Sequence, residues 1–136
     1  MITQKSVNQL VYDILSCAIE VHRHLGPGLL ESIYELCLVE ELKTSGFKVE
    51  SQLEVPVFYK GKKLEASYRV DILVNDLVVV ELKSVDNLLP VYKAQLLTYL
   101  KLLKKPKGIV INFNVESITK YVVPMVTAEF AMLPKE

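Results

Sequence analysis

Apolar residues recur every three or four positions over the first part of the chain, which is the spacing of an amphipathic helix. The pattern predicts a helix over residues 7–25, with Ser6 as its N-cap. The Gly-Pro-Gly sequence at 26–28 should end it, because proline has no amide hydrogen and disfavours a helical residue before it. A second helix is predicted from about 29 to 44, with Gly46 at its C-terminal cap. Its inward residues are expected to be Leu30, Ile33, Cys37 and Leu42.

Between residues 47 and 84 the pattern changes to runs of β-branched and aromatic residues separated by turn residues. It predicts strands at 49–59, 63–74 and 77–84. The last two strands should form a hairpin, because Asn75 and Asp76 tolerate the left-handed backbone of a tight turn. Residues 77–80 are a nearly continuous apolar run, which predicts a central strand covered on both faces.

A third helix is predicted over 91–104, with Pro90 in its first turn. Two inward faces are compatible with its pattern: Ala94, Leu97 and Leu100, or Leu96, Leu100 and Leu103. Residues 107–112 read as a buried strand that follows a helix, so we expect it to pair in parallel with a neighbour. An edge strand is predicted at 118–123, and the pattern assigns no element to 125–136.

The predicted order is therefore α-α-β-β-β-α-β-β. It is typical of an α/β fold on the border of α+β, with a mixed sheet flanked by helices. A length of 136 residues suits one compact domain. We expect a single domain over 1–136, with its core at about 7–123 and a C-terminal segment at 124–136.

Composition limits the partners, the metal sites and the cellular compartment that we expect for this protein. The 16 basic and 16 acidic residues give a formal net charge of zero, so any contact with nucleic acid needs a local patch. Cys17 and Cys37 lack the paired spacing of zinc sites and are expected to be reduced thiols. His22 and His24 lie two apart on a helix and should point in different directions. With neither a signal peptide pattern nor a membrane-spanning apolar run, we expect a cytoplasmic protein without a membrane partner.

Three charged residues interrupt the apolar hairpin: Asp71 in one strand, and Glu81 and Lys83 in the next. Side chains alternate along a strand, so Glu81 and Lys83 leave the same face of the sheet. Spacing alone favours a solvated face that carries a salt bridge. The alternative is a Mg²⁺ site held by Asp71, Glu81 and the backbone carbonyl of Leu82. Lys83 would then orient and help to deprotonate an attacking water, or offset charge in a phosphorane-like transition state.

Two helices carry further polar candidates. Glu31 lies in the first turn of the second helix, where the helix dipole favours an acid. It could also act as a third carboxylate of the metal site. Gln95 and Tyr99 lie four apart and form one polar stripe. The stripe is either a solvated helix face, or it faces the acidic end of the hairpin so that Gln95 positions a water or a phosphate.

Lysines cluster at two places in the sequence, at 60–63 and at 101–107. Ordinary solubilising turns and helix ends account for both clusters. Contact with a phosphate backbone is the less favoured alternative, because base-stacking aromatic residues are not obviously interleaved with the lysines.

Several separated motifs, in order, resemble one known family. Residues 28–34 match G-x-x-E-x-x-Y within AIEVHRHLGPGLLESIYE, and YRVDILV, VVVELKSV and LLPVYKAQLLTYL follow. This combination resembles the GxxExxY protein family of the PD-(D/E)XK nuclease superfamily. The resemblance implies the α-β-β-β-α-β core of restriction endonucleases.

The resemblance also implies roles for individual residues. Asp71, Glu81 and Lys83 correspond to the acid…acid-x-lysine signature, Glu31 to the helix carboxylate, and Gln95 to the polar position on the following helix. The chain departs from the pattern at two places. Val70 replaces the signature proline, and Tyr92-Lys93 stands where relatives often carry a histidine and an acid.

The implied activity is Mg²⁺- or Mn²⁺-dependent hydrolysis of phosphodiester bonds in DNA or RNA. The alternative is a non-catalytic accessory domain that binds nucleic acid or protein and retains a vestigial site. Its support is the neutral charge, the small size and the lack of an evident DNA-recognition element. Nucleases of this architecture often pair, so a homodimer is also considered. The C-terminal segment with Phe130, Met132 and Leu133 could form its interface or could cap the core.

Overall fold

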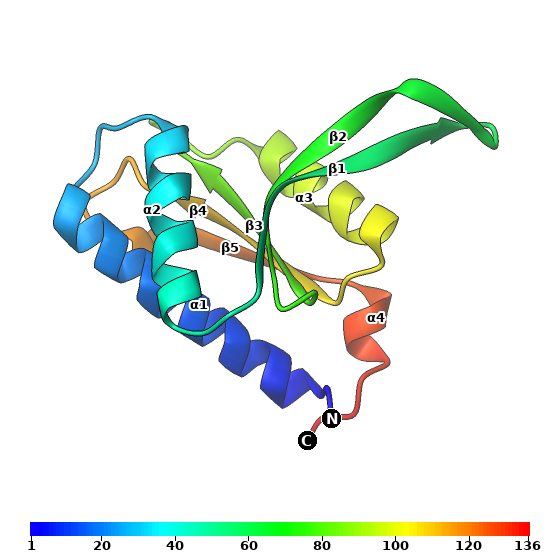
Figure 1. Ribbon diagram of the computed structural model, residues 1–136, viewed down its shortest axis with the longest axis horizontal. Coiled ribbons are helices and arrows are strands. Elements are labelled where there is room, and N and C mark those ends of the chain that lie inside the picture. Colours follow the sequence, from blue (N-terminus) through cyan, green and yellow to red (C-terminus); the bar gives the residue numbers. More distant parts are fainter.

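A five-stranded mixed sheet organises the computed structural model, which describes residues 1–136 (Figure 1). The strands are ordered β1-β2-β3-β4-β5 across the sheet. They are β1 (Val49–Tyr59), β2 (Lys62–Val74), β3 (Val78–Lys83), β4 (Lys107–Asn112) and β5 (Val122–Val126). All neighbours are antiparallel except β3 and β4, whose parallel pairing confirms the prediction for residues 107–112.

Helices cover both faces of this sheet. The helices α1 (Gln4–Leu25) and α2 (Glu31–Thr44) share one apolar core with Val78, Val80 and Leu82 of β3. The helix α3 (Pro90–Leu103) shares a second core with Val79 on the opposite face. Every side chain of β3 from Val78 to Leu82 is buried, so the predicted central strand is confirmed. None of the helices combines the length and apolar character needed to cross a membrane.

The helix α1 begins earlier than predicted. Thr3 is its N-cap, and the Ser6 amide donates to Thr3 Oγ1 at 3.0 Å while the Thr3 amide donates to Ser6 Oγ at 2.9 Å. This reciprocal arrangement is a capping box. Ser6 is therefore the third residue of the helix and not its N-cap, because Thr3 supplies the cap from outside the apolar pattern.

The buried face of α2 also differs from the prediction. Tyr34, Leu38 and Leu42 are buried, whereas Leu30 is 74% and Ile33 is 41% exposed. Leu30 is the N-cap and lies outside the helix, so the face that meets the sheet is set by residues further along. Only Leu42 of the predicted inward set is confirmed as buried, with Cys37 partly buried. Gly46 follows the C-cap with a φ of 92°, as its predicted place at the helix end requires.

On α3, the buried residues are Leu96, Tyr99 and Leu100, which selects the second of the two predicted faces. Ala94 is exposed.

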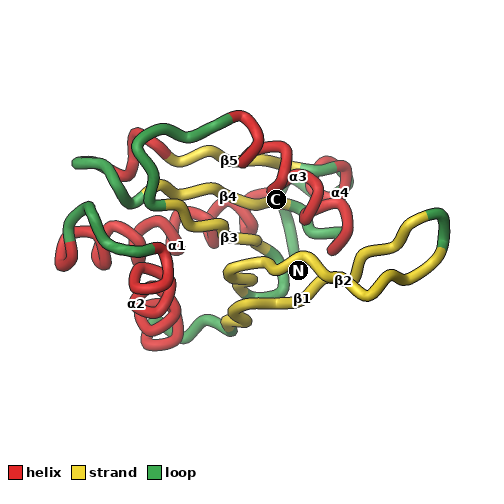
Figure 2. The backbone as a smooth tube through the Cα atoms, turned by 90° about the horizontal axis from the view of Figure 1, so that it is seen from above, coloured by secondary structure: helices red, strands yellow, loops and turns green.

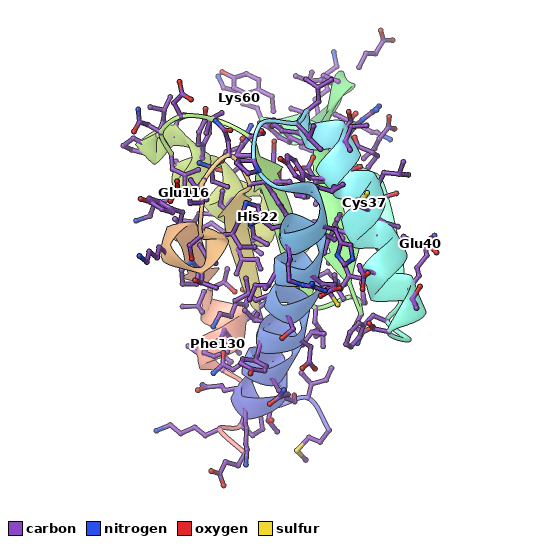
Figure 3. All side chains as sticks on the ribbon, turned by 90° about the vertical axis from the view of Figure 1, so that its left-hand side faces the viewer. His22, Cys37, Glu40, Lys60, Glu116 and Phe130 are labelled. Carbon is purple, nitrogen blue, oxygen red and sulfur yellow. The ribbon has the colours of Figure 1, made fainter.

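The hairpin turn between β2 and β3 is confirmed, since Asn75 and Asp76 have φ values of 51° and 58°. The cysteines are free thiols. His22 Nε2 contacts the Val115 carbonyl at 2.7 Å and His24 Nδ1 contacts the Glu20 carbonyl at 3.0 Å, so the two rings have different partners. Figure 3 shows His22 on α1 and Cys37 on α2.

The C-terminal residues return to the start of α1. The predicted strand at 118–123 is instead a short 3₁₀ helix (Ile118–Tyr121) followed by the edge strand β5, and then by α4 (Ala128–Ala131). The backbone amides of Gln4 and Lys5 donate to the carbonyls of Pro134 and Lys135 at 2.7 and 3.1 Å. Phe130 lies beside α1 in Figure 3, and with Leu133 it packs against the core. This segment therefore caps the core, and the homodimer stays a prediction.

The β1–β2 hairpin extends well beyond the rest of the sheet (Figures 1 and 2). The strand β2 pairs with β3 only over Ile72–Val74, whereas its pairing with β1 continues to Tyr59 and Lys62. The outer part of the hairpin is thus a two-stranded arm, which we define as residues 53–70. Asp71 lies at its base.

Candidate active site

The predicted acidic residues meet where β2 and β3 separate. The ladder between these strands ends at the pair Ile72 and Val80, and Asp71 and Glu81 come next. The Asp71 amide donates to Glu81 Oε1 at 3.2 Å, and the Leu82 amide donates to Asp71 Oδ2 at 2.9 Å. Each carboxylate therefore accepts a backbone hydrogen bond from the opposite strand. These bonds fix both side chains side by side at the end of the ladder.

Burial makes this carboxylate pair electrostatically costly. Glu81 is only 5% exposed, and burial together with the negative charge of Asp71 raises the pKa of Glu81 to about 9. No Lys or Arg nitrogen lies within 4.0 Å of the oxygens of either carboxylate. The salt bridge that spacing alone favoured is therefore absent, and the pair is a place that favours a cation.

Lys83 stands near the pair without bonding to it. It ends β3 and, by strand alternation, leaves the same face as Glu81. Its Nζ lies 4.6 Å from the centroid of the Tyr92 ring at the start of α3. Such a cation–π contact holds the ammonium without neutralising it. The positive charge of Lys83 stays available to a negatively charged ligand.

Glu31 is the first residue of α2, the helix that covers the face of the sheet opposite to α3. Burial raises its pKa, the charge of Lys83 lowers it, and the charge of Asp71 raises it. The Glu31 carboxylate therefore lies within electrostatic range of both residues.

The loop before Glu31 is held by the tyrosine of the G-x-x-E-x-x-Y motif. The Tyr34 hydroxyl donates to the Gly26 carbonyl and accepts from the Leu29 amide at 3.1 Å. The Tyr34 ring is fully buried and stacks on Phe113, with 4.5 Å between ring centroids. Ser84, just after β3, donates to the Leu29 carbonyl at 2.6 Å. Tyr34 thus positions the entry to α2 and does not face the carboxylates.

The polar stripe of α3 divides into a buried and an exposed residue. Tyr99 is buried, and its ring lies 5.6 Å from that of Tyr68. Burial raises the pKa of Tyr99, the charges of Glu81 and Asp71 raise it further, and a hydrogen bond with Gln95 lowers it. Tyr99 therefore lies within electrostatic range of the carboxylate pair, and the exposed Gln95 lies beside Tyr99.

Comparison with known proteins identifies a family for this chain. The family model of the PD-(D/E)XK nuclease superfamily matches residues 8–123, which is most of the chain. The chain belongs to the PD-(D/E)XK nuclease superfamily. No curated protein and no solved structure matched it. The match includes Glu31, Asp71, Glu81, Lys83 and Gln95, and membership of the GxxExxY family within the superfamily stays a prediction.

Nucleases of the PD-(D/E)XK superfamily generally use divalent metal ions such as Mg²⁺. Asp71 and Glu81 fit such an ion, because Mg²⁺ keeps several waters and is typically bound through one or two carboxylates. No group of three or more His, Cys, Asp and Glu side chains in the chain is arranged to hold a metal. Direct ligation by Glu31 together with the pair therefore stays a prediction, as does ligation by the Leu82 carbonyl.

Two contacts of this PD-(D/E)XK site were not predicted from the sequence. One is the ring of Tyr92 against Lys83, for which the only signal in the sequence was that Tyr92-Lys93 departs from the pattern expected for the resembled family. The other is Glu35, whose carboxylate accepts from Gln52 Nε2 at 2.7 and 2.9 Å. Burial raises the pKa of Glu35, Gln52 lowers it, and the charges of Asp71 and Glu31 raise it. The i,i+4 spacing from Glu31 to Glu35 was the available signal.

Proposed function

We propose that this protein is a Mg²⁺- or Mn²⁺-dependent nuclease that hydrolyses phosphodiester bonds in nucleic acid. The observation that carries the proposal is the Asp71–Glu81 pair, in which a buried and a half-buried carboxylate lie side by side without a cationic partner. A pair of this kind costs stability unless a positive ion binds it. Its position agrees with the acid…acid-x-lysine signature of the superfamily.

In this proposal each residue has a separate task. Asp71 and Glu81 bind the divalent ion, which supplies a Lewis acid and a water of lowered pKa when bound. The Leu82 carbonyl is a further oxygen donor beside them. Glu31, at the end of the loop that Tyr34 and Ser84 fix, would be the third carboxylate of the metal site.

Lys83 and Gln95 act on the substrate side. The ammonium of Lys83, held by the Tyr92 ring, would orient the attacking water and, through its positive charge, help that water to lose a proton to the solvent, or it would stabilise negative charge that develops on the phosphate oxygens. Gln95 is exposed next to Tyr99, so its amide can orient a water or a phosphate oxygen. Neither task requires a change in the positions of the two carboxylates.

The second candidate is an accessory domain that binds nucleic acid or protein without catalysis. One observation favours it: the chain contains no group of three carboxylates arranged around one point. Such a domain would keep its acidic pair as a vestige.

A metal titration tests the proposal. A ligand that binds the native state alone raises the melting temperature, so Mg²⁺ or Mn²⁺ should stabilise the wild type but not Asp71→Asn or Glu81→Gln. Glu116→Gln, which changes an exposed carboxylate on the loop between β4 and the 3₁₀ helix, is the matched control and should respond as the wild type does. Equal metal responses in all four proteins would exclude the site.

Cleavage assays then separate the two candidates. Single-stranded and duplex DNA and RNA are incubated with Mn²⁺, and products are resolved on denaturing gels. We expect cleavage that EDTA and Glu81→Gln abolish. Metal stabilisation without cleavage of any substrate would favour the accessory domain. So would a Lys83→Ala variant whose melting temperature in metal and whose cleavage products are the same as those of the wild type.

A further inference from the structure

The arm formed by residues 53–70 ends in a tip that combines aromatic and basic side chains. Phe58 and Tyr59 are 58% and 62% exposed and belong to neither apolar core. Lys60 and Gly61 form the turn, with φ values of 50° and 79°. Residues 58–64 include three lysines and no acid. The tip is thus a positively charged surface with large exposed rings.

Strand register distributes these side chains over both faces of the tip. Phe58 pairs with Lys63, and Tyr59 pairs with Lys62. Paired residues share a face, and successive pairs alternate, so each face carries one ring and one lysine. None of the three lysines forms an ion pair or a side-chain hydrogen bond, and Lys60 lies 5.5 Å from the Tyr59 ring centroid. The sequence did not suggest this interleaving, because the pairing of each ring with a lysine depends on the register of the two strands.

Protection of exposed strand edges is the plain explanation for lysines on such an arm. It does not explain Phe58 and Tyr59, because exposed rings without a core behind them favour the association that edge lysines prevent. A ring beside a free lysine instead matches the requirements of a nucleic-acid strand, whose bases stack on aromatic faces and whose phosphates pair with cations.

We propose that the arm tip binds the unpaired bases and the backbone of a nucleic-acid strand and feeds that strand to the carboxylate pair at the arm's base. This inference rests on the proposed function, since it names the form of substrate. Lys63 and Asp71 lie on the same strand, up to roughly 26 Å apart at about 3.3 Å per residue. At about 3.4 Å per stacked nucleotide, the tip holds the strand roughly eight nucleotides from the carboxylates.

Fluorescence anisotropy tests the charge component. Labelled (dT)20, (U)20 and a 20-base-pair DNA duplex are titrated in EDTA, so that the metal site takes no part. The tip variant carries three substitutions: Lys60→Ala, Lys62→Ala and Lys63→Ala. The matched control removes three exposed lysines outside both lysine clusters: Lys5→Ala, Lys43→Ala and Lys120→Ala. We expect the tip variant to lose about tenfold or more in affinity and to reduce the salt slope by about 2, with the control unchanged.

Stacking has its own readout, because the chain contains no tryptophan. Tyr59→Trp places a single fluorophore at the tip, and Tyr12→Trp places one at an exposed position of α1. Binding of (dT)20 or (U)20 should quench the first and leave the second unchanged. Replacing both Phe58 and Tyr59 by leucine should weaken binding about tenfold without changing the salt slope.

Equal losses in the tip and control triple variants, or no quenching of Tyr59→Trp, would overturn the inference. Tighter binding of the duplex than of both single strands would overturn the stacking role, and absence of binding to all three probes would overturn the whole. These outcomes are independent of catalysis. Binding at the tip without metal stabilisation or cleavage would leave the arm's role intact and reject the nuclease. Cleavage that the tip variants leave unchanged would support the nuclease and reject the arm's role.

Discussion

The Asp71 amide donates a hydrogen bond to Glu81 Oε1 at 3.2 Å across the β2–β3 hairpin. This bond continues the strand ladder with a side chain in place of a carbonyl. It holds the carboxyl group of Glu81, which is buried, beside the carboxylate of Asp71, so burial and the negative charge of Asp71 both oppose the ionisation of Glu81.

The stability of the metal-free protein should depend on the protonation of Glu81. Its pKa is about 9 in the native state and 4.5 ordinarily, so between these values the native protein holds a proton that the unfolded chain releases. The free energy of unfolding therefore falls as the pH rises through this window. Glu81→Gln is neutral throughout and should exceed the wild type by about 1–3 kcal/mol at pH 8, with a much smaller difference at pH 5.

Urea denaturation in EDTA at the two pH values measures this difference. Glu116→Gln provides the matched loss of one exposed carboxylate and should follow the wild type. Parallel pH dependences of the wild type and Glu81→Gln would mean that Glu81 is ionised in the native state.

Tyr34 should prove structural. Tyr34→Phe keeps the ring against Phe113 but removes the hydroxyl that serves Gly26 and Leu29. The expected loss is about 1–2 kcal/mol in the free energy of unfolding, because a partly buried donor and acceptor lose their partner. Tyr12→Phe, at an exposed position, should change stability by less than about 0.5 kcal/mol. Unchanged stability with complete loss of cleavage would instead assign the Tyr34 hydroxyl to the chemistry.

The ring of Tyr92 should matter to Lys83 through its face and not through its hydroxyl. Tyr92→Phe keeps the cation–π contact and should cleave as the wild type does, whereas Tyr92→Leu should slow cleavage about two- to fivefold. Lys83→Ala should cost about a hundredfold or more. Single-turnover cleavage in Mn²⁺ measures all three rates, with melting temperature as the check on folding. Equal rates for Tyr92→Phe and Tyr92→Leu, both well below that of the wild type, would point to the hydroxyl.

Gly108 should be needed for the approach of α3 to the sheet. A Cβ added there would lie 2.8 Å from Leu96 Cδ1 and 3.1 Å from the Val79 carbonyl oxygen. Gly108→Ala should therefore destabilise the protein by about 1–3 kcal/mol through overpacking. Ser67→Ala, on the exposed part of β2, is the control and should be nearly neutral. Thermal unfolding of both variants measures the effect, and a neutral Gly108→Ala would show that α3 can shift without cost.

Local rules predicted those features that depend on neighbours in the sequence. Left-handed backbone at Asn75 and Asp76 follows from the turn they form, and the shared face of Glu81 and Lys83 follows from strand alternation. The continuous apolar run at 77–80 predicted a central strand because only burial on both faces accommodates such a run.

Features that depend on contacts between distant elements were not predictable in this way. The helix α2 carries apolar residues on several sides, so its pattern did not distinguish the buried Tyr34 and Leu38 from the exposed Leu30 and Ile33. The contact of Tyr34 with Phe113 made that choice. The length of the arm had the same origin, because β3 supplies partners for only three residues of β2.

The hairpin at 68–83 shows this division most clearly. Its sequence alone determined two strands, a tight turn and the placement of Asp71, Glu81 and Lys83 among apolar residues, because backbone geometry fixes these over a few residues. The tertiary structure decided that Glu81 is buried beside Asp71 and that Lys83 contacts Tyr92 instead of Glu81. Burial and separation between charges depend on what α2 and α3 place over the strands, and those helices lie outside the hairpin, so its own pattern does not specify their contacts.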